Sequence, residues 1–140
     1  MNRSKLLRWT SFVLIGLTAT GILMVALMAF ANPQSVMDLV QVKLPNNDAY
    51  SSIRGSYGGA GLTIFIWLVF LAIRNPLQGL AFVSLFCGLY ALSRVLTIIL
   101  EGSLGAFGRQ WLFVEATLSA LALLTLLAWR GLPASARPRF

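Results

Sequence analysis

The stretch YSSIRGSYGGAGLTIFIWLVFLAI at residues 50–73 joins a polar entrance to a long apolar run. Tyrosine and arginine side chains favour the boundary between lipid and water, so Arg54 and Tyr57 indicate that a membrane-spanning helix begins near residue 55. Glycines at the same end of the run allow a neighbouring helix to approach closely. We therefore expect the other helices to pack on this one through four glycines, Gly55, Gly58, Gly59 and Gly61.

The composition is that of an integral membrane protein. The 140 residues are 58% hydrophobic and only 11% charged, whereas about a quarter of the residues in an ordinary soluble domain are charged. A run of about 20 apolar residues crosses the ~30 Å apolar layer of a bilayer as a helix. The sequence therefore predicts an all-α, four-helix membrane bundle in a single domain, with spans at about 7–31, 55–73, 77–100 and 110–129.

The first apolar run ends in Ala-Phe-Ala at residues 29–31, which is similar to a signal-peptide cleavage site. The hydrophobic core of a signal peptide is about 7 to 15 residues long, and this run is longer. An uncleaved helix is the favoured interpretation, and a cleaved signal peptide is the alternative.

The charges predict the topology. Cytoplasmic loops and ends of membrane proteins carry an excess of lysine and arginine. Seven of the eleven cations lie at segment ends that fall on one side of a four-span topology, with none of the four acids among them: Arg3, Lys5, Arg8, Arg74, Arg130, Arg137 and Arg139. We expect both termini, including the basic tail at 130–140, to be cytoplasmic. The net charge of +7 then favours anionic lipid over nucleic acid as the partner.

The outer loop at 32–54 is the only long connection. Asn32 and Pro33 are expected to end the first helix, because a proline disfavours helical geometry in the residue before it. Apolar residues between 34 and 52 suggest a short amphipathic helix on the outer surface, ended at Lys43–Pro45. The Asn-Asn-Asp sequence at 46–48 is either a turn or a cap for the next helix.

Arg94 and Glu115 need an explanation, because each lies roughly five residues inside an apolar span. An isolated charge there costs on the order of 3 kcal/mol or more. In two antiparallel helices, residues whose numbers share one sum lie at the same depth. That relation pairs Arg94 with Glu115 and, in nearly the same register, Glu101 with Arg109.

Helical spacing extends this pair into a candidate polar nest. Tyr90 lies four residues before Arg94, Trp111 lies four residues before Glu115, and Arg54 and Tyr57 enter the membrane at the same outer level. An excess of arginine would suit an anionic group. The predicted nest contains Arg54, Tyr57, Tyr90, Arg94 and Glu115, with Glu101 and Arg109 at its rim. The alternative is purely structural: the ion pair pins two helices together, and Arg54 and Tyr57 hydrogen-bond to a helix end.

Several kinds of chemistry find little support in the sequence. It has no histidine and one cysteine, Cys87, so the usual metal sites lack ligands and a histidine base is excluded. We expect no cofactor. A nucleophile and base at plausible spacing are limited to Tyr57 or Ser56 near Glu115, so an enzyme is the least favoured class.

The motif RGSYGG at 54–59, with Arg94, the Glu101–Gly102 pair and Glu115 at the spacings just described, resembles the small bacterial membrane proteins grouped as domain of unknown function 4345. This resemblance covers nearly the whole chain. It implies a four-helix inner-membrane protein and leaves the biochemical role open.

Two functional hypotheses follow. The first is a non-enzymatic accessory or scaffold subunit, which packs its helix faces against other membrane subunits or a second copy of itself. The alternative is a binding or transport protein that holds an anionic lipid, a quinone-like molecule or a small acid in the outer polar nest.

Overall fold

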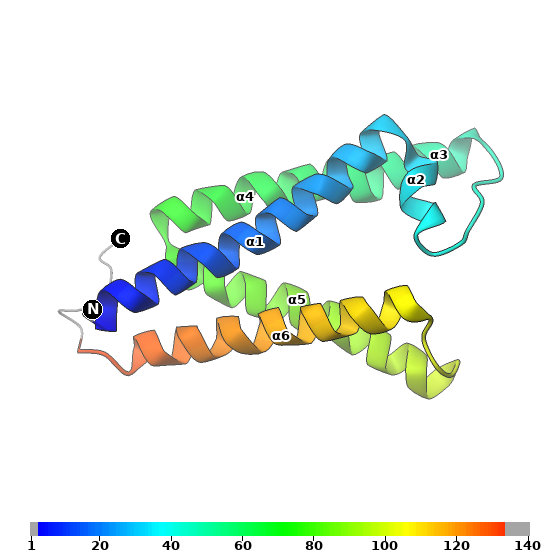
Figure 1. The fold of residues 1–140 in the computed structure, drawn as a ribbon. Helices are drawn as coiled ribbons and strands as arrows, with labels where there is room; N and C mark the ends of the chain where they lie inside the picture. The colour runs from blue at the N-terminus through cyan, green and yellow to red at the C-terminus, as the bar shows by residue number, and fades with distance from the viewer. Residues whose placement is uncertain (1–2, 134–140) are drawn as a thin grey trace. The chain divides into compact units, whose positions relative to one another are not determined.

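The computed structural model describes residues 3–133, which are mostly helical and contain no strand. Four helical stretches in this part are long and apolar enough to cross a membrane, as predicted. They are α1 (Arg3–Ala31), the continuous run of α3 (Asn47–Ile53), η1 (Arg54–Gly59) and α4 (Ala60–Arg74), then α5 (Pro76–Leu100) and α6 (Ala106–Arg130) (Figure 1). Arg137 and Arg139 of the predicted basic tail lie outside the described residues.

The chain divides into two compact units. The hairpin unit comprises Met1–Gly16 with Phe70–Phe140, and the loop unit comprises Leu17–Val69. The helices α1 and α4 each contribute one part to each unit.

Two helices extend beyond their predicted spans. The second run begins at Asn47 rather than near residue 55, because the side chain of Asn46 accepts a hydrogen bond from the backbone N–H of Ala49 at 2.9 Å. This is an N-cap, one of the two roles predicted for the sequence at 46–48. Similarly, α6 begins at Ala106 rather than near residue 110.

The predicted amphipathic helix, expected to end at Lys43–Pro45, is wrong in its length. Only α2 (Pro33–Asp38) forms, started by a cap from Asn32 to the N–H of Gln34. The chain then turns through Gln41, whose φ is 59°, and the N–H of Val42 bonds back to the carbonyl of Met37 at 3.1 Å. A left-handed residue followed by this back-bond is a typical helix C-terminus, so α2 ends before Lys43 is reached.

One glutamine organises the rest of the connection in the loop unit. The Gln34 side-chain amide donates to a carboxylate oxygen of Asp38 at 2.7 Å and to the carbonyl of Val42 at 2.9 Å, and it accepts the N–H of Leu44 at 3.0 Å. An apolar cluster lies beside this network, formed by Ala29, Val36 and Met37 with Val25, Met28, Leu44 and Ile53. The connection between α1 and α3 is therefore a folded loop with a defined structure.

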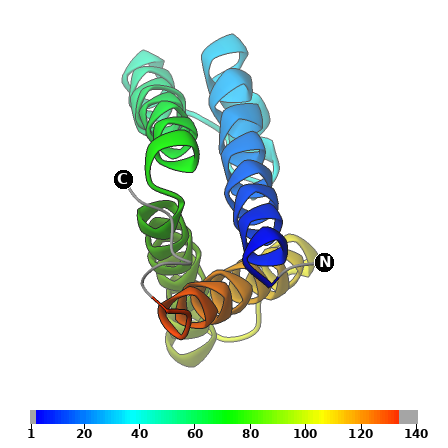
Figure 2. The same ribbon diagram turned by 90° about the vertical axis from the view of Figure 1, so that its left-hand side faces the viewer.

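In the hairpin unit, α5 and α6 pack along each other (Figure 2). Asn75 caps α5 at its first turn, and Gly102, with φ of 102°, lies in the loop to α6. The first half of α1 joins this pair through the Trp129 indole N–H, which donates to the buried Ser11 hydroxyl at 3.1 Å. Close packing adds to this, because a Cβ on Gly79 would lie 2.6 Å from the terminal methyl of the buried Ile15.

The left-handed backbone at Gln41 gives a prediction for the loop unit. The αL conformation costs a non-glycine residue roughly 1–2 kcal/mol, part of which glycine recovers. We expect Gln41→Gly to leave the fold unchanged and to raise the melting temperature of the purified protein in detergent, followed by circular dichroism. Val40→Gly, at a residue with ordinary φ, is the matched control and should lower it. Equal shifts for the two variants would contradict the assignment of strain to Gln41.

Candidate functional site

The centre of the site is an ion pair between α5 and α6. The Arg94 Nε donates to Glu115 Oε2 at 2.6 Å, and Arg94 Nη2 donates to Glu115 Oε1 at 2.9 Å. The two side chains are 20% and 10% exposed, respectively. A two-pronged contact of this kind is among the strongest hydrogen-bonded pairs in proteins, and it confirms the predicted pairing.

The same helix register holds beyond the ion pair. Ser119, one turn after Glu115 on α6, donates its hydroxyl to the backbone carbonyl of Ser84 on α5 at 2.8 Å. Gly88 makes room for this contact, because a Cβ there would lie 3.0 Å from the Ser119 hydroxyl oxygen. Two polar links and one missing side chain therefore fix how α5 and α6 are aligned.

The predicted rim pair is wrong. Within residues 3–133, no ion pair joins Glu101 to Arg109. The equal-depth relation applies only while both segments are helical, and α5 ends at Leu100, so Glu101 already belongs to the loop. Both residues are also exposed, where an ion pair contributes little stability, typically 0–1 kcal/mol.

Aromatic residues follow both helices up to the ion pair. On α5 the rings of Phe82 and Phe86 stack at 5.9 Å, and Phe86 contacts Tyr90 at 4.9 Å, one turn before Arg94. On α6, Phe107 and Trp111 contact at 6.1 Å, with Trp111 one turn before Glu115. Sequence reasoning singled out Tyr90 and Trp111 but missed the three phenylalanines, which continue the same four-residue spacing.

Arg54 and Tyr57 belong to the loop unit, whereas the rest of the predicted nest belongs to the hairpin unit. Arg54 Nε donates to the carbonyl of Phe30, near the C-terminus of α1, at 3.4 Å. This contact matches the structural alternative for Arg54, because cations stabilise the carbonyl end of a helix. Tyr90, Arg94 and Glu115 lie on the α5–α6 pair, and the inclusion of Arg54 and Tyr57 with them stays a prediction.

The motif RGSYGG forms a π-helical segment, η1, which sequence reasoning missed. Its wider turn is evident where the N–H of Ala60 bonds to the carbonyl of Gly55, five residues earlier. Such segments are rare and frequently lie at functional sites. The sequence carries no signal for it, since glycine is compatible with both α- and π-helical turns.

The four glycines of this region divide into two pairs. A Cβ on Gly58 would lie 3.1 Å from the Phe30 ring, and one on Gly61 would lie 3.1 Å from Ala26 Cβ, so these two pack closely on α1 as predicted. A Cβ on Gly55 or Gly59 would meet nothing within 4 Å. Helix packing inside the chain therefore accounts for only half of the cluster.

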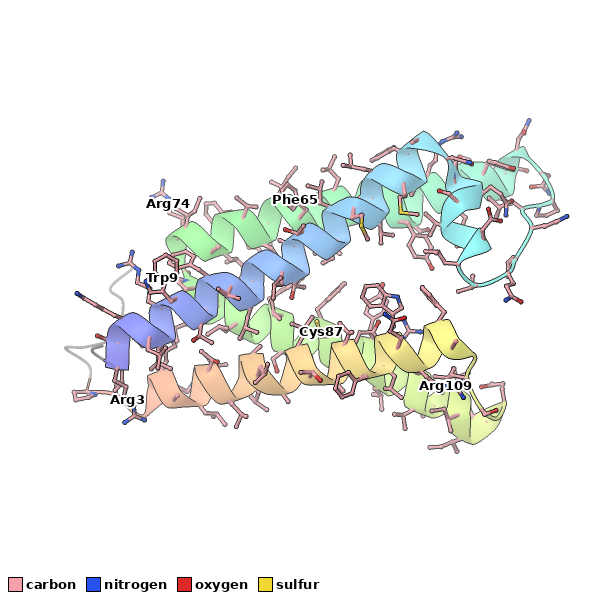
Figure 3. All side chains as sticks on the ribbon, viewed as in Figure 1. Arg3, Trp9, Phe65, Arg74, Cys87 and Arg109 are labelled. Atoms are coloured by element: carbon pink, nitrogen blue, oxygen red, sulfur yellow. The ribbon has the colours of Figure 1, made fainter. Side chains whose placement is uncertain are left out.

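Cys87 is buried in α5 (Figure 3). Among the described residues, no three side chains of the types that usually ligate metals come together.

These observations define an all-helical protein with four helices of membrane-spanning length, two of which, α5 and α6, are joined by the Arg94–Glu115 ion pair. The chain belongs to the family described as domain of unknown function (DUF4345), whose model matches residues 11–126. The match includes both the ion pair and the π-helical motif. Neither a curated protein nor a solved structure matches this chain.

The ion pair predicts that the effects of substitutions at Arg94 and Glu115 on the free energy of unfolding are not additive. Removing one partner leaves a buried charge unpaired, so Glu115→Leu should destabilise the protein by about 3–5 kcal/mol. Arg94→Leu combined with Glu115→Leu removes both charges and should recover most of that loss. Denaturation in mixed micelles, followed by helical circular dichroism, measures each variant. Glu101→Leu is the exposed control with little expected effect, and additive losses at residues 94 and 115 would contradict the pairing.

Proposed function

We propose that this chain is a multi-pass protein of the bacterial inner membrane, with both termini in the cytoplasm. Four helices of suitable length and hydropathy support this proposal. The arrangement of cations in the hairpin unit also supports it, since Arg3 and Arg74 lie at one end and Arg109 lies at the other (Figure 3). An excess of arginine and lysine at one end is typical of the cytoplasmic side.

Within that membrane, the proposed role is that of a non-enzymatic accessory or scaffold subunit. The observation that carries this role is the way Arg94 and Glu115 use their charges. Both carboxylate oxygens of Glu115 bind the Arg94 guanidinium, so the buried charges are engaged in holding α5 to α6. A structural use of intramembrane charge suits a protein whose task is assembly.

The open glycines are the best candidates for the contact with another subunit. Gly55 and Gly59 lie in the π-helical motif and have no neighbour that a Cβ would touch. Small residues let two membrane helices approach closely. A partner helix from another subunit, or from a second copy, would have access to the backbone at this point.

The proposed role predicts that the protein forms a defined complex and that substitution of Gly55 and Gly59 disrupts it. The wild-type protein, extracted gently with its surrounding lipid, should migrate as one species larger than the monomer on native gels. Gly55→Leu with Gly59→Leu should release the monomer without loss of helical signal, because the added side chains meet nothing in the chain itself.

Two controls make this experiment decisive. Gly16→Leu also places a side chain in open space, but outside the motif, and should leave the complex intact. Gly61→Leu should instead lower the stability of the chain, since Ala26 occupies the space. Wild-type protein that remains a monomer under every gentle extraction would overturn the proposed role.

A binding or transport function is the second candidate, favoured by the aromatic residues beside the ion pair. The Tyr90 side chain is half exposed and lies one turn from Arg94, while Trp111 lies one turn from Glu115. Aromatic and polar groups in this arrangement suit a quinone-like molecule or a small acid.

This second function predicts ligand-dependent quenching of tryptophan fluorescence, with a short-chain quinone and a medium-chain fatty acid as probes. Glu115→Gln should retain the helical fold, because the amide oxygen still accepts a hydrogen bond from Arg94, yet abolish the quenching. Trp111→Phe identifies the reporting indole. Quenching that is unchanged in Glu115→Gln would exclude Glu115 from any such site.

A further inference from the structure

A groove runs along the junction of α5 and α6, away from the ion pair. It consists of two adjoining hollows of about 350 and 300 Å³, which share Ala81 and Leu126 in their walls. The second hollow continues along α5 to Leu89, past Ser84 and Gly88. From Leu77 to Leu89 the groove follows α5 for roughly 18 Å at 1.5 Å per residue.

The two ends of the groove differ in chemistry. At one end Asn75, Gln78 and Arg130 join Trp129 in a wall that is otherwise apolar, and Arg130 gives this end its positive charge. Along the rest of its length the groove is lined by leucine and small residues.

The cationic end of this groove coincides with the basic end of the hairpin unit. Arg3 and Arg74 lie at the same end of the unit, while Arg109 lies at the opposite end (Figure 3). An anion at Arg130 would therefore meet a favourable field from several arginines. The second hollow extends from this end between the apolar parts of α5 and α6.

We propose that this groove is a binding site for one anionic phospholipid, with the phosphate at Arg130 and an acyl chain along Ala81, Gly88 and Leu126. The site rests on the proposed insertion into the membrane. Its cationic end and apolar length match the two parts of such a lipid.

The size of the groove favours a lipid over a partner helix. A helix with side chains is about 10 Å wide, so only the tips of its side chains could enter hollows of about 350 and 300 Å³. An extended acyl chain is far thinner. A lipid phosphate would also add a charge-assisted contact at Arg130, which an apolar helix cannot supply.

Native mass spectrometry of the purified chain tests the proposal without any partner subunit. The protein is delipidated in detergent and then offered equal amounts of phosphatidylglycerol and phosphatidylcholine with identical acyl chains. The expected result is retention of one phosphatidylglycerol per chain, at least tenfold more often than phosphatidylcholine.

Two pairs of variants assign the site. Ala81→Phe fills both hollows from an exposed position and should abolish retention, whereas Ala120→Phe, exposed on α6 outside the groove, should not. Arg130→Gln should remove the preference for the anionic lipid, whereas Arg109→Gln at the opposite end should keep it.

Two outcomes would overturn the site: equal retention of the two lipids by the wild type, or retention unchanged in Ala81→Phe. If Ala81→Phe retains its lipid but loses a larger complex, the groove belongs to a partner helix instead. Failure of the scaffold role would appear differently, as a wild-type monomer that still retains its lipid. Failure of membrane insertion would appear as protein absent from the membrane fraction.

Discussion

The need to pair buried charge governs the hairpin unit. An arginine and a glutamate in apolar helices are costly apart, so the only economical arrangement is one that brings Arg94 and Glu115 to the same level. That requirement fixes the register of α5 against α6. The Ser119 hydroxyl then meets the Ser84 carbonyl, and Gly88 leaves the space that this contact needs.

Different interactions stabilise the loop unit. It has no buried ion pair among its described residues, and its connection is held by the three hydrogen bonds of Gln34 and by a small apolar cluster. Asparagine caps start both α2 and α3. A segment expected to form one amphipathic helix on the outer surface instead folds into a short helix and an ordered loop.

Sequence reasoning succeeded where one strong local rule applies. Hydropathy located four long helices, and the cost of buried charge located the Arg94–Glu115 pair. It failed for Glu101 and Arg109, because the equal-depth relation was extended past the end of α5 and both side chains are exposed, so no cost of buried charge brings them together. It also failed for the Gln34 network and the π-helical segment, since an exposed-looking glutamine and a run of glycines are compatible with many structures.

The π-helical segment η1 lies between α3 and α4 in one continuous helical run, and it changes which side of the helix each residue faces. Each residue of an α-helix turns the chain by about 100°, so a wider turn at 54–59 offsets the phase of α3 from that of α4. The residues of α3 that contact the folded loop and the residues of α4 that contact its neighbours therefore need not lie on the same face of one regular α-helix. Deletion of one residue inside RGSYGG would restore a regular α-helix, and either α3 or α4 would then be rotated away from its present contacts.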